Sequence, residues 1–184
     1  MPRLLPATGS FARLPAIFPP FGERDHAVTV AVARSLAGGA RAKGVAMGVP
    51  EVRRYSAGTT WEPVVGYSRA VAAGDFVFVS GCTSVAGAEF VHPGDAYAQT
   101  RQAISNAAAG LAGLGASLAD VVQTRMYVTD ISRWQEFGRA HGDVFGDTRP
   151  ASTMIQVAAL IEPGMLIEVE VVAYRPDIGQ QEVR

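Results

Sequence analysis

The sequence contains few of the residues that form metal centres and nucleophilic sites. Among 184 residues there are one cysteine, Cys82, and three scattered histidines. A lone thiol excludes an internal disulfide, and isolated histidines do not make a metal-binding motif. The chain also lacks a Gly-rich phosphate loop, a GxSxG elbow, an HExxH helix and a CxxC pair. We therefore expect no metal site.

Long hydrophobic runs and a strong charge imbalance are also absent. No apolar run approaches the roughly 18 residues of a membrane-spanning helix. The net charge of −1 gives no sign of a nucleic-acid partner. Five prolines before residue 21 exclude the apolar core of a signal peptide. These absences predict a cytoplasmic protein with neither a membrane nor a nucleic-acid partner.

The first 46 residues differ in composition from the rest of the chain. They carry six Lys/Arg against Glu23 and Asp25 and are rich in proline. We expect a disordered extension outside the fold or a wrongly assigned start, with Met47 as the alternative start; a targeting peptide is the third interpretation. With 48% hydrophobic residues in the whole chain, residues 47–184 can form one domain, whose core we expect at about 52–176.

The regular pattern from residue 52 onward predicts an α+β fold. Alternating apolar residues indicate strands at about 68–72, 76–80, 120–130, 153–160 and 165–174, the first two joined by Gly74-Asp75 and the last two by a turn. Helical spacing indicates helices at about 95–114 and 132–145, with Asp95 as an N-cap and Ser132 with Gln135 as a capping box. We expect a mixed sheet with both helices on one face.

Several strands carry apolar residues on both sides. Two helices can cover only one face of the predicted sheet, so the second face needs another apolar partner. A second copy of the same chain is the simplest such partner. In the strand at 120–130, we expect Val122 and Thr124 on one face, and Val121 and Arg125 on the other.

Two glutamates interrupt the last apolar strand. Glu168 and Glu170 are two residues apart and therefore project from the same face. Carboxylates are disfavoured within a buried strand, so this face is either exposed at the sheet's edge or forms a pocket with a carboxylate that activates water. The sequence leaves both interpretations open.

Other candidates for a binding site precede the first long helix or lie in the central strand. The stretch Ser80-Gly81-Cys82 offers backbone amides that could hold an oxyanion, or it is a turn with a small buried thiol. Tyr67 either contacts a ligand or packs. Arg125 either lies on the surface or presents its guanidinium to a carboxylate. His141 is expected to pack rather than bind.

Taken in order, several stretches resemble the RidA/YjgF family of reactive enamine/imine deaminases. They read "YSRAVAAGDFVFVSG", "QTRQAISNAAAGLAGLGASLADVVQTRMYVTDI", "FGDTRPASTMIQVAAL" and "LIEVEVVAY". The resemblance covers about residues 52–176. It implies a chorismate-mutase-like fold, a homotrimer with small-molecule sites between subunits, and hydrolysis of enamines and imines such as 2-aminoacrylate without a cofactor.

The resemblance also assigns roles to residues and reveals one departure from the family pattern. It implies that Glu168 orients water and that the cleft is lined by Tyr67, by the loop Ser80, Gly81 and Cys82, and by Ser152 and Thr153. Ser152 stands where the family's deaminases have a carboxylate-binding arginine. Two hypotheses follow: a divergent deaminase in which Arg125 or the amides at Ser152 and Thr153 hold the substrate, or a trimeric binding protein without turnover.

Overall fold

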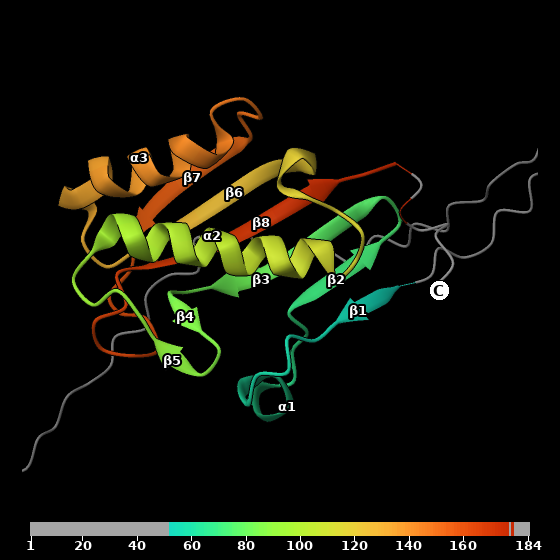
Figure 1. Ribbon diagram of the computed structural model, residues 1–184, viewed down its shortest axis with the longest axis horizontal. Helices are drawn as coiled ribbons and strands as arrows, with labels where there is room; N and C mark the ends of the chain where they lie inside the picture. The colour runs from blue at the N-terminus through green and yellow to red at the C-terminus, as the bar shows by residue number, and fades with distance from the viewer. Residues whose placement is uncertain (1–51, 177, 179–184) are drawn as a thin grey trace, which may run out of the picture. The chain divides into compact units, whose positions relative to one another are not determined.

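A six-stranded sheet with two helices across one face forms the body of the protein (Figure 1). The computed structural model describes residues 52–176 and residue 178. The strands lie in the order β1 (Arg53–Tyr55), β2 (Ala70–Ala73), β3 (Phe76–Cys82), β8 (Ile167–Tyr174), β6 (Val121–Val128) and β7 (Ala151–Gln156). The helices are α2 (Ala96–Ala112) and α3 (Trp134–Phe145). This confirms the predicted α+β class; the expectation for residues 1–46 lies outside the described residues.

Small elements complete the described chain. A short helix α1 (Trp61–Val65) precedes β2, and a two-stranded hairpin, β4 (Val85–Ala86) with β5 (Glu89–Phe90), follows β3. Two 3-10 turns, η1 (Leu118–Asp120) and η2 (Ile131–Arg133), precede β6 and α3. α1 and the hairpin lie beyond the end of the sheet at which β3 finishes (Figure 1), and both contribute to the cavity described below.

The hairpin of β2 and β3 forms where the sequence predicts it. Ala73 pairs with Phe76 across the turn Gly74-Asp75. Gly74 has a φ of 58°, a left-handed conformation that glycine adopts without steric cost. This tight turn fixes the register of the two strands that reach the cavity.

The last two strands are not the neighbours that the sequence suggested. β6 lies between β7 and β8, pairing parallel with the former and antiparallel with the latter. The expectation of two strands joined directly by a turn identified both strands but not their positions in the sheet. The reason is topological, because β7 follows α3 and returns along the outer edge of β6, and a parallel neighbour requires such a crossover.

A shift of register in β6 changes which side chains it buries. Thr124 is fully buried and Arg125 is exposed, so these two side chains lie on opposite faces, as predicted. The prediction was wrong at the beginning of the strand, where Val121 is buried and Val122 is 43% exposed. The pairing with β8 is irregular between Val121 and Gln123, and such an irregularity reverses the alternation of side chains.

Aspartates cap α2 and the 3-10 turn η2 that leads into α3. The Asp95 carboxylate accepts a hydrogen bond from the Ala98 amide at 2.9 Å, which confirms the predicted N-cap of α2. The capping box expected at Ser132 is not formed. Instead, Asp130 accepts from both the amide and the hydroxyl of Ser132, because η2 precedes α3 and moves the cap two residues earlier.

Asp95→Ala should lower the free energy of unfolding by about 0.5–2 kcal/mol, the usual cost of losing an N-cap. The substitution leaves the Ala98 amide without its side-chain acceptor. Chemical denaturation measures the change, and Asp95→Asn, which keeps an acceptor oxygen, is the matched control. An Asp95→Ala variant as stable as the unaltered protein would show that the cap contributes nothing.

The sheet face opposite the helices exposes apolar side chains over the β3–β8 region. Phe76, Phe78 and Tyr174 are 42–47% exposed and lie in ring contact, with centroids 6.3 and 5.1 Å apart. On the helix side, by contrast, Val77, Val79, Val169 and Val171 are almost fully buried. The predicted two-faced sheet is therefore present, and its open face has no cover within the described part of the chain.

Candidate active site

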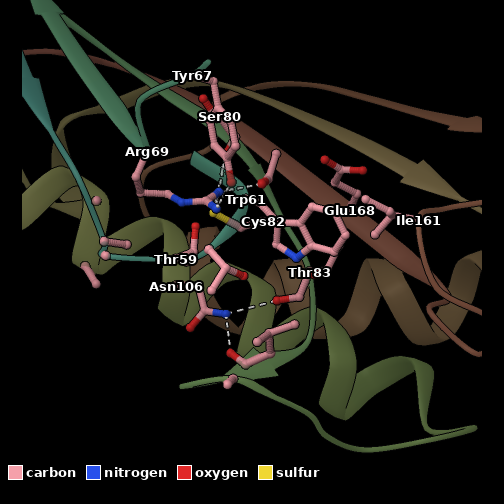
Figure 2. A pocket seen from close by; sticks show the side chains of 18 of the residues that line it. Thr59, Trp61, Tyr67, Arg69, Ser80, Cys82, Thr83, Asn106, Ile161 and Glu168 are labelled. Carbon is pink, nitrogen blue, oxygen red and sulfur yellow. Dashed lines mark hydrogen bonds between the residues drawn. The ribbon is translucent and has the colours of Figure 1, made fainter. Parts of the chain in front are cut away.

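A cavity of about 800 Å³ opens where β3 ends (Figure 2). Its walls come from the segment around α1, the segment before β2, the end of β3, the beginning of β8, the middle of α2 and the loop before β8. Polar side chains reach it from the segment before β2 (Tyr67 and Arg69), from β3 (Ser80 and Cys82) and from β8 (Glu168). The cavity therefore brings together residues up to about one hundred positions apart in sequence.

A β-bulge in β3 shapes the floor of this cavity. Val79 pairs with Val171 and Cys82 with Val169, so β3 has one more residue than β8 over this interval. The extra residue lets both Val79 and Cys82 face the helices and leaves Ser80 and Gly81 beside the cavity. Bulges of this kind re-aim side chains next to functional sites.

Glu168 lies directly over Gly81. A Cβ placed on Gly81 would stand 1.7 Å from Oε1 of Glu168, so only glycine leaves room for this carboxylate. Burial raises the pKa of Glu168, and the neighbouring charge of Glu170 raises it further, while Arg69 lowers it. A half-buried carboxyl with a raised pKa is suited to accept and return protons near neutral pH.

Arg69 supplies the positive charge of the cavity. Its Nη1 donates to the carbonyl of Gly81 at 2.6 Å and contacts Sγ of Cys82 at 3.4 Å, and its Nη2 donates to the hydroxyl of Tyr67 at 3.0 Å. These contacts fix the guanidinium plane at the bulge. All of these partners are neutral groups.

Cys82 is held as a neutral thiol. It is 2% exposed, and burial raises its pKa, although Arg69 acts in the opposite direction. Its Sγ donates to the carbonyl of Ser80 at 3.3 Å, and within the described residues it makes no hydrogen bond to a histidine. A buried thiol without a base partner is a poor nucleophile, so Cys82 forms part of the wall rather than the reacting group.

The wall around α1 is attached through a buried carboxylate, Glu62. It accepts hydrogen bonds from the Ser56 hydroxyl and from the amides of Ala57 and Gly58. Burial alone raises the pKa of Glu62, but these three hydrogen bonds and Arg69 outweigh that cost, and the net shift is downward. The carboxylate thus fixes the loop that carries Ala57 and Gly58, two residues of the cavity wall.

The structure brings five of the eight predicted site residues to one cavity: Tyr67, Ser80, Gly81, Cys82 and Glu168. Their roles in binding or catalysis stay predictions. Within this group, the Ser80 hydroxyl donates to the carbonyl of Ser68 at 2.8 Å, which ties β3 to the segment carrying Tyr67 and Arg69.

The other three predicted residues lie outside the cavity. Arg125 projects from the open sheet face and pairs with Glu170 at 3.6 Å, half exposed. Ser152 and Thr153 are exposed on the edge strand β7. The Ser152 hydroxyl accepts from Thr124 at 2.9 Å, and Thr124 lies 2.9 Å from Nε2 of His141. Whether these residues meet a ligand stays a prediction that depends on a second subunit.

Sequence reasoning missed Arg69 and Asn106. Arg69 is two residues from Tyr67 on the same side of an extended segment, and that spacing was the available signal. Asn106 lies on α2, and its amide donates to the carbonyls of Thr83 and Val85 at 3.0 and 2.7 Å. These two hydrogen bonds hold the chain that follows β3 against the cavity. An asparagine in the middle of a helix does not indicate such a contact in the sequence.

A family model described as endoribonuclease L-PSP matches residues 58–175 of the chain, well over half of its length. The chain belongs to this family, the YjgF/RidA family. The match begins at the loop fixed by Glu62 and ends just after β8, so it includes every residue of the cavity that carries charge. The resemblance inferred from the sequence is thereby confirmed.

Three relatives illustrate the family membership. The crystal structure of Rv2704 from Mycobacterium tuberculosis, of the YjgF/YER057c/UK114 family, is 47% identical with a TM-score of 0.62, covering 67% of this chain and 99% of that one. SCO2049 of Streptomyces coelicolor is 39% identical over 124 residues, 67% of this chain and 92% of its own. The 3-aminoacrylate deaminase RutC of Acinetobacter baylyi is 33% identical over 113 residues, 61% and 89% of the two chains.

Membrane-spanning helices and clusters of metal ligands are both absent from the described residues. No helix among them is long and apolar enough to cross a membrane. No group of three or more His, Cys, Asp or Glu side chains in the same part of the chain is arranged to hold a metal ion.

Proposed function

We propose that this YjgF/RidA-family protein hydrolyses small reactive enamines and imines, such as 2-aminoacrylate, to a 2-oxo acid and ammonia. The observation that carries the proposal is the Glu168 carboxyl, which lies against Gly81 in the cavity with a raised pKa. The deaminase name of the relative RutC supports the same reaction class.

The chemistry needs one group that moves protons in both directions. The enamine first becomes an imine by moving a proton from nitrogen to its terminal carbon. Glu168 takes a proton from water as the water oxygen bonds to the imine carbon and the C=N electron pair moves to nitrogen. The carboxyl then returns that proton to the nitrogen, which gives a carbinolamine. In a second transfer, the carboxylate takes the proton of the new hydroxyl group and passes it to the amino nitrogen, so that the C–N bond breaks, ammonia leaves and the C=O bond forms. One water is consumed, and the protein is unchanged.

The proposal includes a homotrimer whose subunits cover the open sheet face. Phe76, Phe78 and Tyr174 lie exposed there, and family members are expected to place their sites between subunits. In such an assembly, Arg125, Ser152 or Thr153 of a partner subunit would border the cavity. The single chain provides Glu168 and Arg69, and the assembly would close the remaining side.

Phe78→Glu is expected to convert the assembly to monomers or to reduce its stability severely. It would bury a charge without a partner in the apolar interface, which is costly. Size-exclusion chromatography with light scattering measures the mass, and Val64→Glu on the exposed helix α1 is the matched control. A Phe78→Glu protein of trimeric mass would place the subunit interface elsewhere.

The direct test of the reaction is ammonia or 2-oxo-acid release from freshly generated 2-aminoacrylate, compared with the spontaneous rate. Turnover above that rate supports the deaminase. The alternative, a trimeric small-molecule-binding protein without turnover, draws on Ser152, which stands where active relatives are expected to have an arginine. Absence of turnover in the unaltered protein, with turnover gained by Ser152→Arg, would favour the alternative.

A further inference from the structure

Arg69 has the properties of an anion-binding residue. Among the described residues, none of its nitrogens has a carboxylate oxygen within 4.0 Å. Its hydrogen bonds go to two backbone carbonyls, a thiol and a phenol, none of which neutralises a charge. Arg69 lowers the pKa of Glu62 and of Glu168, so both carboxylates lie within its electrostatic reach, but neither accepts a hydrogen bond from it. A half-buried guanidinium whose hydrogen-bond partners are all neutral retains its attraction for an anion. The same contacts hold its orientation before a ligand arrives, so little side-chain entropy is lost on binding.

The cavity also contains a matching negative group. Glu168 lines the same cavity, and its pKa is lowered by Arg69, yet the two do not form an ion pair. In Figure 2 the guanidinium lies beside Cys82, and the Glu168 carboxylate stands apart from it. A cation and a carboxylate that face one cavity without pairing fit a ligand carrying both charges at a short separation.

We infer that Arg69 binds the carboxylate of the ligand and so selects small imino or amino acids over neutral imines. The inference rests on the proposed function for the identity of the reacting group. With the carboxylate at Arg69, the imine nitrogen and carbon must reach Glu168, which lines the same cavity. The arginine missing at Ser152 would then be replaced within the same chain, from the segment before β2 instead of from β7. Arg125, the substitute cation expected from the sequence, is already paired with Glu170.

Binding of pyruvate tests this inference without requiring turnover. Pyruvate is the 2-oxo acid that hydrolysis of 2-aminoacrylate yields, and titration calorimetry gives its dissociation constant. Arg69→Gln should weaken pyruvate binding about ten- to hundredfold, the range for losing a charged hydrogen bond. Arg69→Lys should lose less, because it retains the charge but not the two-pronged geometry. Arg101→Gln, which removes an exposed arginine from α2, should bind as the unaltered protein does.

A neutral analogue separates the carboxylate contact from general damage. Pyruvamide has the same shape as pyruvate without the charge, so Arg69→Gln should change its binding little. Thermal unfolding shows whether each variant is folded. If Arg69→Gln does not fold, the inference is tested by pyruvate binding to Arg69→Lys and by the ratio of the dissociation constants for pyruvate and pyruvamide in the unaltered protein. The inference is overturned if Arg69→Gln binds pyruvate normally, or if the unaltered protein binds pyruvate no better than pyruvamide.

Turnover distinguishes this inference from the proposed function. If 2-aminoacrylate is hydrolysed and Arg69→Gln leaves KM unchanged, the deaminase stands and the role of Arg69 fails. If no hydrolysis occurs but pyruvate binds through Arg69, the anion site stands and the deaminase fails. If Arg69→Gln raises KM for 2-aminoacrylate by the same factor as it weakens pyruvate binding, the deaminase and the role of Arg69 are both supported.

Discussion

Replacing Glu168 by Gln should lower kcat for 2-aminoacrylate hydrolysis by about 100- to 10,000-fold, the range for removing a general acid–base group. Glutamine has nearly the same size and can still hydrogen-bond to water, but it cannot take up a proton. The loss should therefore be in kcat, with KM changed less. Stopped-flow measurement of 2-oxo-acid formation, corrected for spontaneous hydrolysis, gives kcat and KM for each variant. A Glu168→Gln enzyme within threefold of the unaltered kcat would assign the proton transfer to another group.

The pH profile adds a sharper control for the same residue. A base must be ionised, so kcat/KM should fall as the pH drops through the pKa of Glu168, which lies above its ordinary value. Glu170→Gln removes a negative charge that raises this pKa, so the acidic limb should move to lower pH while activity near neutrality is retained. An acidic limb that does not move in Glu170→Gln would mean that it belongs to a different group.

Gly81→Ala should reduce kcat by about 100-fold or more while leaving the fold intact. The three atoms nearest to an added Cβ all belong to the Glu168 side chain, at 1.7–2.9 Å. A flexible carboxylate can move aside, and Gly81 does not have the positive φ that would strain alanine, so the unfolding free energy should change by only about 1 kcal/mol. Displacing a catalytic group by about 1 Å can cost about 100-fold in rate.

Combining the two substitutions tests whether they act through the same atoms. If Gly81→Ala acts by displacing the carboxylate, the double variant with Glu168→Gln should be no slower than Glu168→Gln alone. Gly142→Ala on α3, where an added Cβ meets nothing within 4 Å, is the matched control and should retain full activity. Additive losses in the double variant would show that Gly81 contributes separately, for example through its backbone.

Local sequence patterns predicted most helices and strands and the position of Glu168 in the candidate site. Alternation along β8 placed Glu168 and Glu170 on one face, and the structure has them there because β8 pairs regularly with β6 over these residues and the bulge opposite them lies in β3. The Gly74-Asp75 turn and the Asp95 cap were also readable, because each depends on residues within three positions of one another. Interactions of this short range are fully represented in a local stretch of sequence.

The features that the sequence did not predict depend on contacts between distant segments. The bulge at Gly81 arises from the pairing of β3 with β8, about ninety residues later, and no local pattern indicates it. Arg69 is held at the cavity by its hydrogen bond to the carbonyl of Gly81, twelve residues later, and this contact cannot be inferred from the local sequence. The position of β7 outside β6 depends on how α3 crosses the sheet. Each of these three features is determined by tertiary contacts, which outweigh local sequence preference.

The carboxylate of Glu62 stabilises the loop at Ala57 and Gly58 in the cavity wall, and this stabilisation depends on pH, unlike the apolar packing of the sheet. Its pKa is lowered in the folded state, so the stabilisation it provides is present above the unfolded-state pKa and disappears as the pH falls through the folded-state value. Protonation would release the loop at Ala57 and Gly58 but would leave the apolar packing of α2 on the sheet untouched. Acid should therefore open the ligand site by local unfolding before it melts the domain.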